Sequence, residues 1–483
     1  MPRAPAAAKA TGYEMSFSTF TRSIRIARPA AEVFAWHERP GAFERLAPPW
    51  QKLQLLARSG GIRDGATVSL RTKIGPLWVR WDVEHRDYQA GVQFRDVQHR
   101  GPFAHWEHLH RVEPVEDGRA CVLTDAITYR LPFGPLGRIF GGALARRELE
   151  RLFNYRQALT QTDLESTARY IAVRPMTFLL AGASGLVGRA LSAFLQTQGH
   201  TVIRLVRRAT TTADEVFWNP AIGEIPAQAL RGVDVVVNLA GEGIADARWS
   251  EARKTALRRS RVESTRTLVA AMAAIKSERL RPFVFISASA TGFYGSRGDE
   301  VLDEQSAAGS GFLASVCADW EREAVAAEEL GVRVVRLRTG VVLTPAGGAL
   351  AKMLPVFTAG LGGRIGAGQR WLSWISLDDL VGAIYHAVLD WRCYGPVNAV
   401  APQPVTNAEF TATLAQVLHR PALLPVPPCA LRLALGEMAD ETLLSSARVQ
   451  PGKLTEAGYR FRHQNVESAL RAGLGYAASP PQT

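Results

Sequence analysis

The chain has 483 residues, too many for one ordinary hydrophobic core, so two or three domains are expected. It contains 47% hydrophobic and 21% charged residues, which is an ordinary globular composition. The 57 lysines and arginines exceed the 45 acidic residues, giving a net charge of +12. Because this excess is spread along the chain and no nucleic-acid motif accompanies it, we expect no DNA or RNA partner. Anionic ligands such as phosphates are favoured.

The cysteines and the apolar runs indicate the cellular compartment of the protein. The four cysteines are scattered without metal-binding or redox spacing, which indicates reduced thiols in a cytoplasmic protein. No run of about 18 apolar residues is present, so we expect neither a transmembrane helix nor stable membrane insertion. The first fifteen residues lack the apolar segment of a targeting peptide and predict an unstructured tail.

Residues 16–165 have the pattern of a mixed α and β domain. Phe20–Ile26 alternates like a strand, Pro29 begins a short helix, and a second short helix follows. The segment ends in a long amphipathic helix with apolar positions between Leu136 and Phe153. Between the short and long helices, further strands are predicted at Val68–Ile74, Trp78–Val83, Val92–Gln98, Trp106–Val112 and Cys121–Leu131.

This order of elements resembles the α+β helix-grip fold of the START-like ligand-binding superfamily, which includes polyketide cyclases and coenzyme-Q-binding proteins. The resemblance is carried by RIARPAAEVFAWHERPGAFERLAPPW and FRDVQHRGPFAHWEHLH and covers most of these 150 residues. It implies an apolar cavity between the sheet and the long helix. We therefore expect this domain to bind a hydrophobic small molecule.

Three histidines, His105, His108 and His110, lie close together in this domain, and the last two are expected on one face of a strand. A metal site is one interpretation of such a group. No clear carboxylate or cysteine joins them on that face, however, and the resemblance implies cavity or surface packing. We therefore expect no metal site.

A linker at residues 166–175 leads into TFLLAGASGLVGRAL, residues 177–191, where an apolar strand precedes three glycines and apolar residues at helical spacing. Strand, glycine turn and helix in this order are typical of the first βαβ unit of a dinucleotide-binding domain. There the helix N-terminus offers unpaired N–H groups to the pyrophosphate. The residues expected at the cofactor are Gly182, Ala183, Ser184, Gly185, Leu186, Val187 and Gly188.

The next predicted strand, Thr201–Val206, ends in Arg207 and Arg208 instead of the acidic residue that binds a ribose 2′-hydroxyl. Two arginines suit a 2′-phosphate, so NADP is expected and NAD is less favoured. The alternative is that both are ordinary surface arginines. Further cofactor contacts are expected at the carboxyl ends of the following strands, from Asn238, Leu239, Ala240, Gly241 and Ser287.

Strands and helices alternate through residues 176–400, which predicts a doubly wound, Rossmann-like parallel sheet. Residues 401–478 predict a C-terminal helical region. The motifs GASGLVG, NLAG, SASATGFYG and RTGVV resemble an extended short-chain dehydrogenase/reductase. NLAGEGIADARW, FLASVCADWE, GGALAKMLPVF, WLSWISLDDL and PVTNAEF more closely resemble an atypical, epimerase-family subgroup. The resemblance to extended short-chain dehydrogenases implies that the C-terminal region covers the substrate and that Gly458–Phe461 is the strand that closes the domain.

The resembled family uses a serine, a tyrosine and a lysine four residues after the tyrosine for proton exchange during hydride transfer. Ser289 matches the serine, with Ser287 a near alternative, but no tyrosine in this chain has a lysine four residues later. Tyr294 is the nearest phenol and a candidate acid/base, although a packing or substrate-contact role is at least as well supported. Cys317 is a weaker candidate proton donor and fits a buried helix position better.

The leading hypothesis is an NADP-dependent oxidoreductase or epimerase-like enzyme that acts on a small and, given the fused domain, apolar substrate. The alternative is a catalytically silent NADP-binding sensor or regulator coupled to a lipid- or quinone-binding domain. No residue pattern names the substrate, the direction of the reaction or the oligomeric state.

Overall fold

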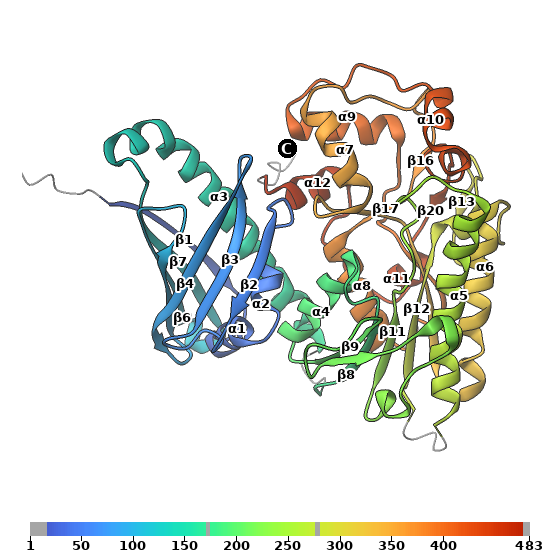
Figure 1. Ribbon diagram of the computed structural model, residues 1–483, viewed down its shortest axis with the longest axis horizontal. Coiled ribbons are helices and arrows are strands. Elements are labelled where there is room, and N and C mark those ends of the chain that lie inside the picture. Colours follow the sequence, from blue (N-terminus) through green and yellow to red (C-terminus); the bar gives the residue numbers. More distant parts are fainter. Residues whose placement is uncertain (1–16, 171–173, 276–280, 477–483) are drawn as a thin grey trace, which may run out of the picture. The chain divides into compact units, whose positions relative to one another are not determined.

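The computed structural model describes residues 17–170, 174–275 and 281–476 (Figure 1). The predicted N-terminal tail and part of the predicted linker lie outside the described residues. Contacts between residues divide the chain into two compact units, and each is described by itself. Unit 1 comprises Met1–Ala35 and Lys52–Gln157, and unit 2 comprises Trp36–Gln51 and Ala158–Thr483.

Unit 1 is built on a seven-stranded antiparallel sheet in the order β1-β7-β6-β5-β4-β3-β2. The short helix α1 (Ala30–Glu38) follows the first strand, and the long helix α3 (Gly134–Thr167) follows the last; the second short helix, α2 (Ala42–Leu46), belongs to unit 2. The strands are β1 (Ser18–Ile26), β2 (Leu53–Arg58), β3 (Thr67–Ile74), β4 (Leu77–Gln89), β5 (Gln93–Arg100), β6 (His105–Val115) and β7 (Ala120–Arg130).

The sheet of unit 1 has one face against α3, and burial alternates along β6 and β7 as it must in a strand with one buried face. Aromatic side chains fill the space between sheet and helix, where Phe153 of α3 packs with Phe20 and Trp106. The predicted helix-grip, START-like fold is confirmed. Strand β2 was not predicted, because as an edge strand it exposes residues on both faces and lacks the alternating pattern.

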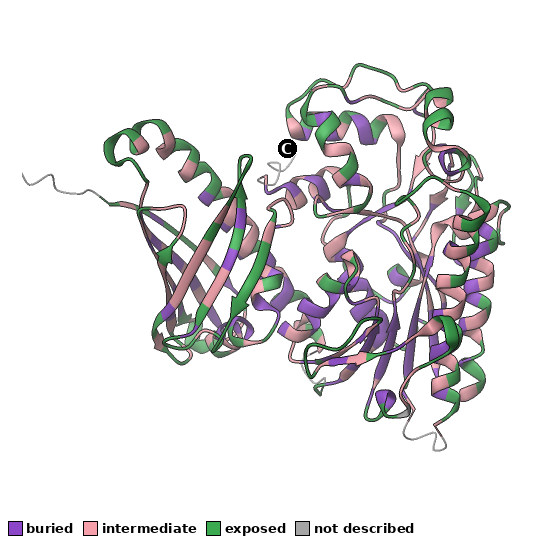
Figure 2. Cartoon of the chain, viewed as in Figure 1, coloured by how far each residue is buried: buried purple, intermediate pink, exposed green. Residues whose placement is uncertain are grey.

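Unit 2 is built on a seven-stranded parallel sheet in the order β10-β9-β8-β11-β12-β14-β18, which confirms the predicted doubly wound, Rossmann-like fold. Helices α4 (Leu186–Thr197) and α8 (Leu377–Leu389) cover one face, and α5 (Glu251–Ala273) and α6 (Phe312–Val325) cover the other (Figure 1). The strands are buried on both faces, as Figure 2 shows. They are β8 (Thr177–Ala181), β9 (Thr201–Val206), β10 (Glu215–Phe217), β11 (Val235–Asn238), β12 (Val284–Ala290), β14 (Arg333–Thr339) and β18 (Gly395–Ala399).

The strand that closes the sheet of unit 2 is β18, which pairs with β14. The prediction of a closing strand at Gly458–Phe461 is wrong, because that segment is a turn and an irregular stretch. Its aromatic side chains Tyr459 and Phe461 instead pack against the core on the α8 side of the sheet.

The C-terminal part of unit 2 has its own apolar core, centred on Trp374, Phe410 and Leu470. A capping box at Thr406 and Glu409 begins α9, as the sequence predicts. The helices here are α7 (Gly348–Thr358), α9 (Asn407–Leu418), α10 (Pro428–Leu435), α11 (Gly452–Glu456) and α12 (Val466–Leu474). Short strand pairs complete it: β13 (Val301–Leu302) with β20 (Arg448–Val449), β15 (Val341–Leu343) with β17 (Trp374–Ser376), and β16 (Trp371–Leu372) with β19 (Val405–Thr406).

Among the described helices, none combines the length and the apolar composition that crossing a bilayer requires.

Candidate functional site

The glycine turn between β8 and α4 lies in contact with the loop that follows β11. Gly182 has φ of +81°, and a Cβ atom there would lie 2.7 Å from the carbonyl oxygen of Leu239. A Cβ at Gly188 would lie 2.2 Å from the carbonyl oxygen of Gly182. Both positions therefore require glycine, one for the turn and one for the close approach of helix and strand.

This contact lies at the point of the sheet where the strand order reverses, between β8 and β11. In doubly wound sheets that point carries the ligand-binding crevice, at the carboxyl ends of the strands. The residues predicted to bind the cofactor differ in exposure: Ser184, Gly185 and Gly241 are exposed, Leu186, Val187, Leu239 and Ala240 are half-buried, and Ala183 is buried.

Asn238, the last residue of β11, is fully buried. Its Nδ2 donates hydrogen bonds to the hydroxyls of Ser264 (3.3 Å) and Thr265 (2.9 Å) on α5. Its Oδ1 accepts a bond of 3.1 Å from the backbone N–H of Ala240. The side chain thus shapes the loop beside the glycine turn, and the contacts that it makes are to protein groups.

The two arginines after β9 have different surroundings. Arg208 donates two hydrogen bonds to the carboxylate of Glu215 on β10, at 2.9 and 2.6 Å. The Arg208 guanidinium holds the pKa of Glu215 down, to about 2. Arg207 is exposed and makes no hydrogen bond or ion pair with any described residue. Of the two, Arg207 has the side chain that is available to a ligand.

The start of α7 lies beside the glycine turn. A Cβ at Gly347 would lie 3.2 Å from the side chain of Leu186, the first residue of α4. Lys352 of α7 donates a hydrogen bond of 2.7 Å to the carbonyl oxygen of Ala245, in the loop after β11. Segments from three parts of the chain therefore converge at the carboxyl end of the sheet.

Ser289 and Tyr294, the predicted catalytic residues, belong to one buried hydrogen-bond network. The Ser289 hydroxyl donates to Glu321 at 2.7 Å, and the guanidinium of Arg338 bonds both oxygens of that carboxylate at 2.8 and 2.9 Å. Arg338 also donates to the Tyr294 hydroxyl at 3.0 Å. Sequence reasoning missed Glu321 and Arg338, although both lie in motifs, ADWE and RTG, that the chain displays.

The Tyr294 side chain is 0% exposed. Its hydroxyl lies 2.7 Å from Oδ1 of Asn398 and 2.8 Å from the carbonyl oxygen of Asp303. Burial raises the pKa of Tyr294 against the opposing effect of Arg338. A phenol that is buried, fully hydrogen-bonded and harder to ionise than usual fits the packing role better than the acid/base role.

The remaining candidate residues are Cys317 and Ser287. Burial raises the pKa of the Cys317 thiol to about 11, so this cysteine stays protonated and unreactive at neutral pH. The hydroxyl of Ser287, on β12 opposite Asn238, is buried and has no hydrogen-bond partner among the described residues. A buried hydroxyl without a protein partner has hydrogen-bonding capacity left for a water molecule or a ligand.

Unit 1 contains a second group of polar side chains. His108 and His110 share the inward face of β6, as predicted, while His105 lies outside the buried pattern. Contrary to the expectation that no carboxylate joins them, Asp96 on β5 pairs across the strands with His108, and Asp125 on β7 pairs with His110. The carboxylates were missed because they come from neighbouring strands, and cross-strand register cannot be read from spacing within one strand.

Known protein families match three segments of the chain. Residues 178–396 match the NAD dependent epimerase/dehydratase family. Residues 18–163 match the polyketide cyclase/dehydrase and lipid transport family. Residues 426–472 match a domain of unknown function, DUF1731.

Relatives from bacteria and plants resemble unit 2. The epimerase family protein Mb2239 of Mycobacterium bovis is 48% identical over 302 residues, which are 62% of this chain and 97% of that protein. The chloroplastic epimerase family protein SDR39U1 homolog of Arabidopsis thaliana is 40% identical over 306 residues, 62% of this chain and 86% of the relative.

Two solved structures extend the comparison. The nucleoside-diphosphate sugar epimerase from Corynebacterium glutamicum has a TM-score of 0.78 and 35% identity, covering 94% of this chain and 90% of its own. Human epimerase family protein SDR39U1, solved with NADPH, has a TM-score of 0.55 and 31% identity, covering 61% of this chain and 98% of its own. The chain therefore belongs to the NAD-dependent epimerase/dehydratase family, as an atypical extended short-chain dehydrogenase/reductase preceded by a START-like domain of the polyketide cyclase and lipid transport type.

Proposed function

We propose that unit 2 binds NADP(H) at the carboxyl ends of β8 and β11, with the pyrophosphate at the N-terminus of α4. The observation that carries this proposal is the glycine turn, whose Gly182 and Gly188 leave no room for a side chain and which leads into the N-terminus of α4. The loop at Leu239 and the unpaired hydroxyl of Ser287 are the further contacts. The NADPH in the structure of human SDR39U1 supports the same cofactor.

NADP is proposed over NAD because of the residue that follows β9. Arg207 is exposed, and a guanidinium matches the geometry of a phosphate with two parallel hydrogen bonds. Arg208 remains a supporting candidate, since its side chain is held by Glu215 beside the same strand end.

We propose that this site belongs to an oxidoreductase or epimerase-like enzyme with a small, apolar substrate. When bound, the nicotinamide supplies hydride transfer. The chain's own contribution is to bind and orient the substrate, because the Ser289 hydroxyl already donates its hydrogen bond to Glu321. A second function is favoured by the burial of Tyr294: an NADP-binding sensor or regulator without turnover.

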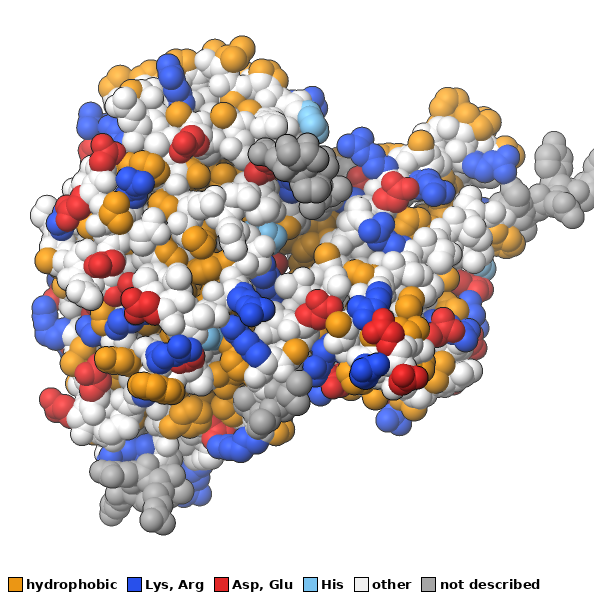
Figure 3. All heavy atoms as spheres, turned by 180° about the vertical axis from the view of Figure 1, so that it is seen from behind, with side chains coloured by type: hydrophobic (Ala, Val, Ile, Leu, Met, Phe, Trp, Pro, Cys, Tyr) orange, Lys and Arg blue, Asp and Glu red, His pale blue; other side chains and the backbone are white. Residues whose placement is uncertain are grey.

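Unit 1 is proposed to bind a hydrophobic small molecule at the end of the sheet where α3 begins. That end carries apolar side chains in contact with solvent, and Figure 3 shows hydrophobic groups gathered there. Exposed apolar patches of this kind mark ligand or membrane interaction sites. The residues are Phe133, Leu136, Ile139, Phe140 and Leu144 from α3 and its approach, and Ile74, Leu77 and Trp78 from β3 and β4.

The four cysteines are all free, three of them buried, which suits the reducing compartment of the proposed cytoplasmic location. Native mass spectrometry of freshly purified full-length protein tests both binding proposals together. We expect a copurified dinucleotide of NADP mass and an apolar ligand in the same particles, and a preparation with NAD or with no dinucleotide contradicts the cofactor proposal.

A turnover test separates the enzyme from the sensor. The protein is incubated with NADPH and a panel of apolar carbonyl compounds and quinones, and absorbance at the nicotinamide band is followed. Oxidation of NADPH by wild type that a Ser289→Ala variant loses supports the enzyme and the assignment of Ser289. Tight NADPH binding without oxidation across the panel supports the sensor. Turnover that survives Ser289→Ala removes Ser289 from the catalytic assignment.

A further inference from the structure

The interior of unit 1 holds a row of histidines and aspartates that the apolar-ligand function does not use. His85 on β4, Asp96 on β5 and His108 on β6 stand opposite one another across three adjacent strands. His110 and Asp125 stand opposite one another across β6 and β7. Four of these five side chains are buried, and the side chain of Asp96 is 23% exposed. These five side chains are therefore mostly shielded from solvent, and Asp96 is the member of the row that solvent reaches.

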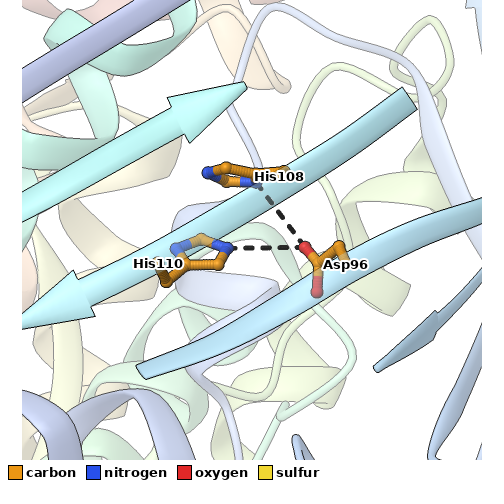
Figure 4. Close-up of side chains that lie close together, drawn as sticks. All are labelled: Asp96, His108 and His110. Atoms are coloured by element: carbon orange, nitrogen blue, oxygen red, sulfur yellow. Dashed lines mark hydrogen bonds and ion pairs between the residues drawn. The ribbon is translucent and has the colours of Figure 1, made fainter. Parts of the chain in front are cut away.

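Figure 4 shows that His108 and His110 each turn one ring nitrogen toward the same oxygen of Asp96. The ligand atoms that Asp96, His108 and His110 offer all lie within 4.8 Å of one another. Oδ2 of Asp96 lies 3.6 Å from Nδ1 of His108 and 3.4 Å from Nε2 of His110. In a tetrahedral zinc site with bonds of about 2.1 Å, neighbouring ligand atoms are about 3.4 Å apart. The two separations that involve Asp96 are close to the edge length of such a tetrahedron, and the two histidine nitrogens lie within 4.8 Å of each other.

The opposite ring nitrogens are also engaged. Nε2 of His108 and Nδ1 of His110 each lie 3.0 Å from Oδ1 of Asp125. A histidine that binds a metal through one nitrogen almost always donates its other N–H to a carboxylate or carbonyl, which fixes the ring and its tautomer. Asp125 makes such a hydrogen bond with His108 and lies at ion-pair distance from His110, and Gln157 of α3 anchors Asp125 with a hydrogen bond of 2.7 Å.

The remaining oxygen of Asp96 is oriented in the same way. Nε2 of His85 lies 3.1 Å from Oδ1 of Asp96, and Nδ1 of His85 lies 3.3 Å from the carbonyl oxygen of Ala66. His85 therefore lies at ion-pair distance from one Asp96 oxygen, and the other oxygen faces His108 and His110. Three ligands and two orienting residues come from four adjacent strands, so the sheet itself sets their spacing.

The competing explanation is a metal-free charge network. Two buried carboxylates attract protons and cations: burial alone lowers the pKa of His110, but its hydrogen bonds to Asp125 and Asp96 outweigh burial and raise that pKa to about 9. Arg156 of α3 lies in the field of the same two carboxylates. In such a network, the positive charges of a protonated His110 and of Arg156 balance the negative charges of the two aspartates. We favour the metal because each ring places one nitrogen near Asp125 and the other near Asp96, so that one nitrogen can bind an ion while a carboxylate orients the opposite one.

We propose that Asp96, His108 and His110 form a binding site for a divalent metal ion of the zinc type, with a fourth position open to water or to an oxygen atom of a ligand. Two imidazoles and one carboxylate are the donor set of zinc sites that keep an open position. Asp125 and His85 act as positioning residues. This site is independent of the proposed dinucleotide function, because all five side chains belong to unit 1.

The test uses full-length protein without a histidine tag. Metal is removed with a chelator, and Zn²⁺ is then titrated by calorimetry while the ligand set is read from zinc X-ray absorption. We expect one Zn²⁺ per chain with only nitrogen and oxygen ligands, two of them imidazoles, and a higher unfolding temperature on binding. Co²⁺ in place of Zn²⁺ should give the visible absorption of a four-coordinate site. Wild type that binds no stoichiometric Zn²⁺, or binds it through sulfur, overturns the proposal.

Variants locate the ion, and circular dichroism establishes that each is folded. His108→Gln and His110→Gln should abolish stoichiometric Zn²⁺ binding, and Asp125→Asn should weaken it 10- to 100-fold. His105→Gln is the matched control, because this histidine lies on the same strand outside the buried row. Zn²⁺ affinity that is equal in wild type and the His108 variant, or that is lost in the His105 control, overturns the assignment. If the variants do not fold, the imidazole count from the wild-type absorption spectrum decides.

Discussion

Arg207 and Arg208 are neighbours in the sequence, but their side chains have different partners. Arg208 bonds Glu215, whereas Arg207 extends into solvent after β9. The same contrast separates Ser287, whose hydroxyl has no hydrogen-bond partner in the described part of the chain, from Tyr294, whose hydroxyl has three. At the residue scale, a side chain is available for a ligand only if the protein has not already used its hydrogen-bonding capacity.

Replacement of Arg207 should change cofactor preference more than replacement of Arg208. Arg207→Ala removes a charge-assisted contact to the 2′-phosphate, worth roughly 1.5–3 kcal/mol, so NADPH affinity should fall about 10- to 100-fold. Affinity for NADH should stay unchanged, because NADH lacks that phosphate. Fluorescence titration with both cofactors measures the effect.

Arg259→Ala is the control for that experiment, since Arg259 is an exposed arginine paired with Glu263 on α5. It should leave both affinities as in wild type. An NADPH preference that persists in the Arg207 variant would show that this arginine does not read the 2′-phosphate.

Replacement of Tyr294 should affect stability rather than cofactor binding. Tyr294→Phe removes the partner of Oδ1 of Asn398 and of one guanidinium nitrogen of Arg338, which costs about 1–3 kcal/mol of unfolding free energy. Tyr394→Phe, at an exposed position, should cost almost nothing. Denaturant unfolding measures both, and NADPH titration should give wild-type affinity. Lost turnover at wild-type stability would restore Tyr294 as the acid/base.

At the scale of elements, α3 has two different halves. Its middle contributes Leu149 and Phe153 to the core of unit 1, whereas its first turns expose large apolar side chains. The antiparallel register places the β3–β4 turn at the same end of the sheet as the start of α3. Apolar groups from two elements thus meet solvent at one end, where the proposed ligand enters.

A polar substitution at the start of α3 should weaken binding of an apolar ligand without unfolding the protein. Phe140 is 83% exposed and Ile139 is 70% exposed, so Ile139→Asp with Phe140→Asp should leave the unfolding free energy within about 0.5 kcal/mol. Each lost side chain contributes roughly 1.5–3 kcal/mol when a ligand covers it, so affinity should fall at least tenfold.

Displacement of a fluorescent fatty acid measures that loss of affinity. Trp391→Asp replaces an equally exposed apolar residue of unit 2 and serves as the control. Wild-type affinity in the α3 double variant would place the ligand elsewhere in unit 1.

At the scale of the whole molecule, unit 2 keeps two histidines neutral inside its core. Burial lowers the pKa of His200 to about 4, and it also lowers the pKa of His386 to about 4. The backbone N–H of Met176 donates to Nδ1 of His200, and the guanidinium of Arg169 donates to Nδ1 of His386. These bonds require the neutral rings, so protonation of either histidine opposes folding.

Unit 2 should therefore lose stability in mild acid. The unfolded chain takes up protons below its ordinary histidine pKa of about 6.5, and the folded chain does so only below about 4. Between these values the unfolding free energy should fall, as pH falls, by at most about 1.4 kcal/mol per pH unit for each histidine.

Hydrogen exchange of the β8 amides at pH 7.5 and pH 5.5 reports on unit 2 and tests this prediction. His200→Gln removes one of the two titrating groups and should reduce the pH dependence by about half. A dependence that is identical in wild type and the variant would assign the acid sensitivity to other groups.

Several elements were predictable because their signals are local. The strand, glycine turn and helix at residues 177–191 and the alternation along β6 and β7 depend on residues adjacent in the chain. Strand β18, by contrast, is recognisable only from its pairing with β14. The carboxylates of Asp96 and Asp125 were missed for the same reason, since their histidine partners lie on other strands.

The sequence by itself determined the two fold classes, the place of the glycine turn and the loss of the usual tyrosine and lysine pair, because periodicity, turn chemistry and residue identity are properties of the chain. Only the tertiary structure decided which of the candidate residues are accessible. It buried Tyr294, bound Arg208 to Glu215 and brought Asp96 to His108 and His110. Burial and cross-strand neighbours depend on how distant segments pack, and spacing along the chain does not encode that directly.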